Sequence, residues 1–175
     1  PTQVTQALLP IGTGNDWIKS YRLPRTPEAM LRVIQAGKTQ LQDVGHIRYE
    51  TDEGPAERYF VNVAGMAYDG YVARRAEQYG NGGKLFYLYL VARCLQEYEL
   101  REAVVRTDGK VYRDHFYTIN FGIGRYSGGG MQLVPHADPP AGKFAVTLAG
   151  NISRVGVMLN TYRFYNATIG GHPRV

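Results

Sequence analysis

The sequence predicts an α+β protein, in which a mostly antiparallel β region follows the tail of an α/β layer. Three observations carry this prediction. Several short apolar strands, separated by turns and by few crossover helices, run from Thr39 to Leu148. The pair Asp108-Gly109 between two alternating segments is typical of a two-residue hairpin, which joins antiparallel strands. The first 37 residues differ from the rest, because their pattern is strand, loop and two helices.

Composition and charge restrict the class of protein. Of the 175 residues, 44% are hydrophobic and 20% are charged, which predicts a packed core and excludes a disordered chain. The net charge of +5 favours anionic partners, such as nucleic acid, phospholipid or nucleotide phosphates. The longest apolar run, Leu85 to Ala92, is far shorter than the ~20 residues of a membrane-spanning helix. The single cysteine, Cys94, is expected in the core, and the absence of a signal-peptide pattern favours a cytoplasmic protein.

The N-terminal segment is typical of the end of an α/β layer. Residues Ala7 to Ile11 form an apolar run that predicts a strand, and Gly12 to Asp16 predict the tight loop before a short helix. Thr26-Pro27-Glu28 predicts the start of a second helix, with a capping hydroxyl, a proline at the first helical position and an acid in the first turn. Gly37 ends this helix. We place the domain boundary here, with residues 1–37 ending one domain and residues 38–175 forming a second, incomplete one.

The remaining elements follow from hydrophobic periodicity and turn residues. Alternation predicts a half-buried strand over 117–123, with Ile119 and Phe121 on its apolar face. The other predicted strands cover residues 39–50, 57–64, 103–107, 110–113 and 144–148. The other predicted helices cover residues 69–79, 84–99 and 152–163. The helix over 84–99 is apolar on all sides at its start, which favours core packing over the alternative of a lipid path or an aromatic surface.

A Gly-Thr-Gly loop between a predicted strand and a helix start is suited to binding phosphate. Its glycines let backbone N–H groups approach an anion, and Thr13 adds a hydroxyl. The alternative is purely steric, because many such turns need glycine for their conformation. The Walker A pattern is absent from the sequence. The short motif alone therefore does not distinguish a phosphate-binding site from an ordinary turn.

The longer string from Leu9 to Trp17, LPIGTGNDW, is more specific. It resembles the P-x-G-T-x-N-D-[FW] segment of the diacylglycerol kinase catalytic-domain family, which includes bacterial lipid kinases and sphingosine kinases. Other segments follow in that family's order over essentially the whole chain. They are Asp43-Val44-Gly45, Phe60 to Gly65, Lys84, Gly128-Gly129-Gly130 with Pro135, and Gly171 to Val175.

This resemblance implies a fold, a reaction and cofactors. The fold is a two-layer antiparallel β-sandwich domain with helices, preceded by the C-terminal part of an α/β nucleotide-binding domain. The reaction is that of an ATP-dependent lipid kinase, which transfers the γ-phosphoryl group of ATP to a lipid hydroxyl with the help of Mg²⁺. The implied partners are a lipid such as diacylglycerol and a membrane surface that is contacted peripherally. Nucleic acid is not among them, and homodimer formation stays open.

The resemblance also assigns residues. It places Gly12, Thr13, Gly14 and Asn15 at the nucleotide, and Asp16 and Asp43 in an acidic network around the catalytic Mg²⁺. Taken singly, Asp16 is equally well an acid that complements a helix dipole, and Asp43 a turn former. The family's G-G-D-G-T phosphate loop and its D-G-E segment, thought to supply the base, do not occur in these 175 residues. The catalytic base is therefore unknown, and we expect the chain alone to be inactive.

Some bacterial members of the family bind a second, structural Mg²⁺ through an aspartate in an A-x-x-x-D-G turn. The corresponding segment, Ala137 to Lys143, has Ala141 in place of that aspartate. Asp138 is an alternative ligand, but a two-proline turn explains it equally well. We expect this second site to be lost.

Two other functions stay open at the level of sequence. One is a kinase of a soluble substrate, like the NAD kinases of the same broad superfamily. A requirement for lipid vesicles would distinguish a lipid kinase from it. The other is a basic nucleic-acid-binding module, suggested by the net charge and the 14 tyrosines. No basic run is interleaved with aromatic residues, which argues against such a module.

Overall fold

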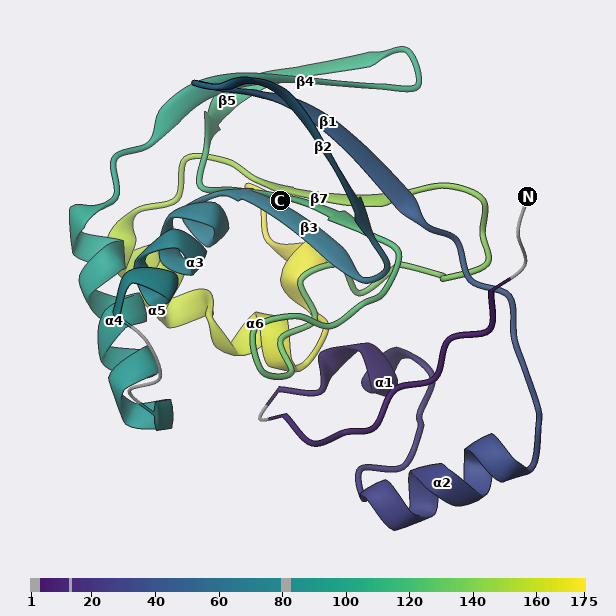
Figure 1. The fold of residues 1–175 in the computed structure, drawn as a ribbon. Coiled ribbons are helices and arrows are strands. Elements are labelled where there is room, and N and C mark those ends of the chain that lie inside the picture. Colours follow the sequence, from purple (N-terminus) through teal and green to yellow (C-terminus); the bar gives the residue numbers. More distant parts are fainter. Residues whose placement is uncertain (1–3, 13, 80–82) are drawn as a thin grey trace. The chain divides into compact units, whose positions relative to one another are not determined.

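The computed structural model describes residues 4–12, 14–79 and 83–175 (Figure 1). The chain forms two compact units. Unit 1 comprises Pro1–Val63 and Gly122–Ala145, and unit 2 comprises Ala64–Phe121 and Val146–Val175. Each unit is therefore built from two separate stretches of sequence. The domain boundary between residues 37 and 38 stays a prediction.

Unit 1 contains two helices and a hairpin: α1 (Asp16–Ser20), α2 (Pro27–Gln35), β1 (Gly45–Thr51) and β2 (Gly54–Phe60). The predicted start of α2 is confirmed, because the Thr26 side chain accepts a hydrogen bond from the backbone N–H of Ala29 and Pro27 is the first helical residue. Strands β1 and β2 pair antiparallel, in register from Gly45 opposite Phe60 to Thr51 opposite Gly54.

Two strand predictions in unit 1 are wrong, and the strand predicted over residues 39–50 begins only at Gly45. Residues Ala7 to Ile11 form no strand, since the described chain offers them no pairing neighbour and Pro10 has no N–H to donate. The segment 57–64 is two strands instead of one. The carbonyl of Asn62 accepts the N–H groups of Ile123 and Gly124, so the chain leaves the β1–β2 hairpin there and enters another sheet at β3 (Val63–Ala67).

Unit 2 contains a three-stranded sheet, a hairpin and several helices. The sheet has the order β3-β6-β7, with β6 (Thr118–Gly122) in the centre and β7 (Ala145–Ala149) at one edge. The hairpin pairs β4 (Arg101–Thr107) with β5 (Lys110–Phe116) antiparallel, as predicted. The helices are α3 (Tyr68–Tyr79), α4 (Gly83–Glu97), α5 (Arg154–Asn160), α6 (Tyr162–Tyr165) and a 3₁₀ turn at Ile169–Gly171.

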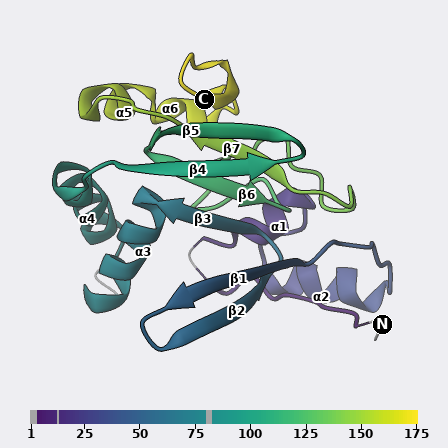
Figure 2. The same cartoon turned by 90° about the horizontal axis from the view of Figure 1, so that it is seen from above.

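The core of unit 2 lies on both faces of its sheet. On one face the β4–β5 hairpin packs against β6, through Val105, Phe116 and Ile119 (Figure 2). On the other side α3 and α4 cover Tyr117 and Ala149 with the side chains of Tyr68, Val72, Leu90, Cys94 and Leu95. Sheet, hairpin and helices therefore form the predicted α+β fold with antiparallel strands. Cys94 is a core residue as expected.

Strand β6 differs from its prediction in one respect. A half-buried strand was expected, but Thr118 and Asn120 are buried together with Ile119 because α3 covers the side that was assigned to solvent. Over the described part of the chain, no helix combines the length and the apolar character needed to cross a bilayer.

Candidate functional site

The loop before α1 is shaped by Asn15. Its backbone is left-handed, with φ 46°, and its side-chain amide donates to the carbonyls of Pro10, at 3.2 Å, and Gly12, at 2.5 Å. Gly12 and Gly14 do not have positive φ, and a Cβ on either would make only ordinary contacts, at 3.4 and 3.5 Å. The loop's own packing therefore does not require these two glycines. Thr13 lies outside the described residues.

Asp16 connects this loop to a glycine loop far along the chain. One carboxylate oxygen accepts from the Lys19 ammonium at 2.5 Å, and the other accepts from the backbone N–H of Gly129 at 2.7 Å. The Asp16 side chain is only 12% exposed. Thus two of the segments that carry the family resemblance, 113 residues apart, meet at one carboxylate.

The glycine loop itself cannot be built from other residues without strain. Gly128, Gly129 and Gly130 all have positive φ, of 64°, 85° and 109°. In addition, a Cβ on Gly130 would lie 3.1 Å from the Lys19 ammonium, which is tighter than a normal contact. The G-G-G motif therefore has a structural reason in this chain, which is a sharply turning loop fixed by Asp16 and faced by a cation.

Asp43 holds a different loop. Its backbone N–H donates to the carbonyl of Pro139 at 3.0 Å, and its carboxylate accepts from the N–H of Gly142 at 2.6 Å. The loop is closed by a bond from the Ala141 N–H to the Asp138 carbonyl, at 3.0 Å. Asp43 is therefore the acidic residue that fixes the turn containing Ala141. The loss of the structural Mg²⁺ stays a prediction.

Gln42 connects α1 to the Asp43 segment, a role that the sequence does not reveal. Its carbonyl oxygen accepts from the Trp17 indole at 2.8 Å and from the Tyr21 hydroxyl, while its amide donates to the carbonyl of Val61 at 2.7 Å. Burial, and secondly the negative charge of Asp43, raise the pKa of Tyr21 to about 12. Tyr21 therefore stays a neutral hydrogen-bond donor at physiological pH.

The acidic residues of this region offer few ligands for Mg²⁺. No group of three or more His, Cys, Asp or Glu side chains suited to a metal occurs in the ranges 4–12, 14–79 and 83–175. Both oxygens of Asp16 accept bonds from protein groups, and Asp43 holds a separate loop. Mg²⁺ in phosphoryl-transfer sites needs only one or two carboxylates, with waters and substrate phosphates completing its shell. These aspartates are thus compatible with such a partial site, and their metal role stays a prediction.

A second polar cluster lies within unit 2. The carboxylate of Asp69 accepts from the Thr118 hydroxyl and, at 3.0 Å, from the amide of Asn120, which is fully buried. Burial raises the pKa of Asp69, although the two hydrogen bonds act in the opposite direction. A Cβ on Gly65 would lie 2.8 Å from the Asn120 side-chain oxygen, so this position needs glycine. The sequence pattern did not predict this cluster, because Thr118 and Asn120 alternate with apolar residues as they would on the solvent-exposed face of a strand.

Residues 62–175 match the model of the YegS C-terminal NAD kinase beta sandwich-like domain. The chain belongs to this family. The predicted resemblance to the lipid kinases is thereby confirmed, and so is a β-sandwich-like domain as its main part.

Relatives of the YegS C-terminal domain match over most of this chain. A diacylglycerol kinase of Mycobacterium tuberculosis is 28% identical over 160 residues, which cover 90% of the chain and 51% of the relative. A Pseudomonas putida protein named "Probable lipid kinase YegS-like" is 26% identical over 138 residues, with 78% and 44% covered. The chain therefore spans about half the length of the curated relatives it matches.

A solved structure shows the same fold. The crystal structure of a diacylglycerol kinase from Bacillus anthracis str. Sterne superposes with a TM-score of 0.58 at 18% identity, over 90% of this chain and 48% of that one. The YegS C-terminal match begins at residue 62, so it contains the loops of Gly129 and Gly142 but not Asp16 or Asp43. The nucleotide and metal roles of Gly12, Gly14, Asn15, Asp16 and Asp43 therefore stay predictions.

Proposed function

We propose that the whole protein is an ATP-dependent lipid kinase, which transfers the γ-phosphoryl group of ATP to the hydroxyl of a diacylglycerol-like lipid. Family membership and the names of the relatives support a lipid kinase. The observation that carries the proposal is the bond from the Gly129 N–H to Asp16. It brings the G-T-G-N-D loop against the G-G-G loop, which is the arrangement expected if both contribute to one nucleotide site.

Phosphoryl transfer depends mainly on positioning and on neutralising phosphate charge. In this chain the Asn15 side-chain amide donates to the carbonyls of Pro10 and Gly12, which fixes the backbone of these three described residues relative to one another. Gly12 and Gly14 keep that backbone accessible without being required by packing. Asp16 orients the Lys19 ammonium beside Gly130, which provides a fixed positive charge next to the glycine loop. Mg²⁺ bound with the nucleotide would neutralise further phosphate charge, with Asp16 and Asp43 as its proposed carboxylates.

The second candidate is a kinase of a soluble substrate, because the matching family is described as NAD kinase beta sandwich-like. A kinase assay with the full-length protein that carries this chain separates the two. Radiolabelled ATP and Mg²⁺ are incubated with diacylglycerol in mixed micelles, and in parallel with NAD in solution. We expect label in the lipid fraction and none in NAD. Transfer to NAD alone would establish the second candidate, and transfer to neither acceptor would refute both.

A further inference from the structure

Helices α5 and α6 present an uncovered apolar face. The residue between them, Thr161, has helical dihedral angles (φ −55°, ψ −34°), so the two helices continue one another (Figure 2). Five large apolar side chains along this segment are each more than half exposed. They are Val155 at 64%, Met158 at 65%, Leu159 at 69%, Tyr162 at 57% and Tyr165 at 55%.

The spacing of these residues places them on one side of the segment. From Val155 they follow at i+3, i+4, i+7 and i+10, which is the periodicity of a single helix face. The opposite face of the segment faces the protein core, because Val157 packs against the core formed with α3 and α4. The exposed side chains are therefore not the core side of the helix, and they form a second, separate apolar stripe.

The charged side chains within residues 139–175 have one sign. No aspartate or glutamate occurs from Pro139 to Val175, whereas Arg154, Arg163 and Arg174 lie in or after the two helices. None of these three arginines forms an ion pair with another described residue. The guanidinium of Arg163 lies over the Tyr162 ring, 5.9 Å from its centroid, and its Nε is buried with no acceptor in the described part of the chain.

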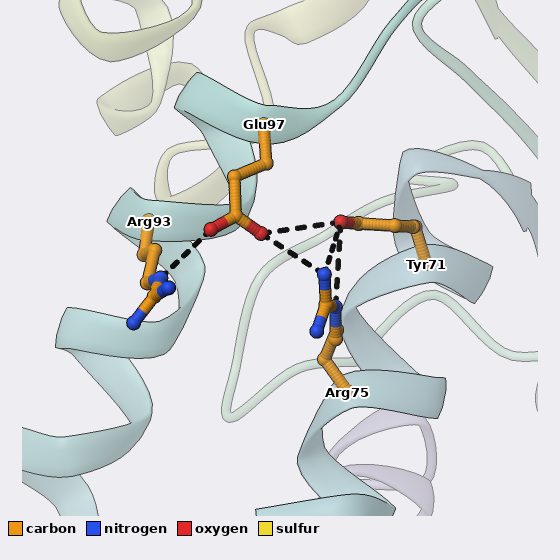
Figure 3. A network of polar contacts seen from close by, with 4 residues as sticks. All are labelled: Tyr71, Arg75, Arg93 and Glu97. Carbon is orange, nitrogen blue, oxygen red and sulfur yellow. Dashed lines mark hydrogen bonds and ion pairs between the residues drawn. The ribbon is translucent and has the colours of Figure 1, made fainter.

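Two arginines of α3 and α4 differ in this respect, although Arg74 of α3 is also without an ion pair to a described residue. Arg75 and Arg93 are both paired with Glu97, at 3.2 and 2.7 Å, and the Tyr71 hydroxyl closes the network (Figure 3). Glu97 therefore offsets one of these two positive charges within the protein. The arginines of the α5–α6 segment keep an unbalanced charge beside exposed apolar groups.

We propose that the exposed face of α5–α6, defined by Val155, Met158, Leu159, Tyr162 and Tyr165 with Arg154 and Arg163, docks on an anionic phospholipid surface. An amphipathic helix with aromatic and aliphatic residues on one side and arginines at its border lies in the headgroup region of a bilayer. There the apolar side chains leave water, and the arginines meet lipid phosphates. The proposal deepens the proposed function, because a lipid kinase must reach its substrate at a membrane, but the test below needs no catalysis.

Co-sedimentation with sucrose-loaded vesicles tests this surface in the full-length protein. The vesicles contain phosphatidylcholine alone or phosphatidylcholine with 30% phosphatidylglycerol, and neither ATP nor diacylglycerol is present. We expect binding to the anionic vesicles to exceed binding to the neutral ones and to weaken with salt. The double variant Val155→Ser/Leu159→Ser should bind anionic vesicles about tenfold less, because two apolar side chains no longer enter the interface. Arg154→Gln should lower anionic binding only.

Val111→Ser is the matched control, since Val111 is an equally exposed apolar residue, at 62%, on the β4–β5 hairpin. It should bind like the wild type, and thermal unfolding verifies that all variants are folded. Unchanged vesicle binding by Val155→Ser/Leu159→Ser would overturn the proposal. Loss of self-association in that variant, measured by sedimentation velocity, with vesicle binding intact would assign the face to a second copy instead. Because catalysis is not measured, loss of the kinase proposal would leave these results unaffected.

Discussion

At the scale of single residues, each predicted acidic residue holds a backbone loop. Asp16 accepts the N–H of Gly129, and Asp43 accepts the N–H of Gly142. Both glycines have positive φ, so the loops are turned sharply where the carboxylates hold them. A carboxylate that accepts a backbone N–H forms a strong, charge-assisted bond. The two aspartates thus have a structural role in addition to any contact with metal, and experiments must separate these roles.

Asp16→Asn separates them. The amide oxygen can still accept from Gly129, while the negative charge and the ion pair with Lys19 are lost. We expect the free energy of unfolding to fall by about 1 kcal/mol or less. If the carboxylate acts at the nucleotide, turnover of the full-length protein should drop at least about tenfold, which corresponds to ~1.4 kcal/mol. Melting temperature and initial rate are measured on one preparation.

Glu28→Gln is the control for this variant, because Glu28 is also an acid in a first helical turn, in α2, and is exposed. It should lose a comparable amount of stability and keep its full rate. An unchanged rate in Asp16→Asn would remove Asp16 from the active site and leave only its structural role.

Asp69 predicts a specific pH dependence of stability. Burial raises its pKa above the ordinary value of 3.8, so the folded state binds this proton more tightly than the unfolded state. The contribution of this group to stability is therefore complete below pH 3.8 and is lost as pH rises through the folded pKa. In Asp69→Asn, whose side chain stays neutral, the free energy of unfolding should increase relative to the wild type between pH 4 and pH 7. Urea unfolding at four pH values measures it.

Asp52→Asn, in the exposed turn between β1 and β2, serves as the comparison for Asp69→Asn. A difference between Asp69→Asn and the wild type that stays constant over this pH range would show that Asp69 is not the group responsible.

At the scale of elements, the sequence predicted those helices and strands whose limits depend on a local turn or cap. The β4–β5 hairpin forms at Asp108-Gly109, where both residues have positive φ, and α2 begins at its capping threonine. The limits of β3 were not predictable in the same way. Val61 and Val63 continue one alternating pattern, but the carbonyl of Asn62 bonds to Ile123 and Gly124, and this distant contact divides the pattern between two sheets.

Gly109→Ala tests how far the hairpin depends on its turn. Gly109 has φ +80°, and no atom lies within 4 Å of an added Cβ, so the substitution acts through backbone strain alone. We expect the free energy of unfolding to fall by about 1–2 kcal/mol, the cost of a left-handed residue with a side chain. Gly170→Ala also adds a methyl group in open space, but without positive φ, and should change stability by no more than about 0.5 kcal/mol. Equal stability of the two variants would contradict this account of the turn.

At the scale of the whole molecule, the site is assembled from segments that sequence alone cannot bring together. The motif from Leu9 to Trp17 was visible in the sequence and predicted the family, which the match over residues 62–175 confirms. The residues that contact this motif could not be predicted from the sequence. Gly129 meets Asp16 only because the chain folds, and Gln42 is not part of any recognisable motif. The sequence thus identifies the motifs of the site, whereas the residues that contact these motifs are known only from the folded structure.

The chain's share of its relatives leads to the last prediction. It spans about half of the diacylglycerol kinase that it matches, and the G-G-D-G-T loop and the D-G-E segment do not occur in it. Correct positioning of the reacting groups supplies as much as ~7–11 kcal/mol of a reaction barrier, so a site that lacks its phosphate loop and its base loses most of this. We therefore expect the purified 175-residue chain to phosphorylate diacylglycerol no faster than a blank without protein, whereas the full-length protein is active. Cooperative thermal unfolding of the chain verifies that it is folded, so that inactivity reflects absent groups. Label in the lipid above the blank would contradict the prediction and place all the essential groups within these 175 residues.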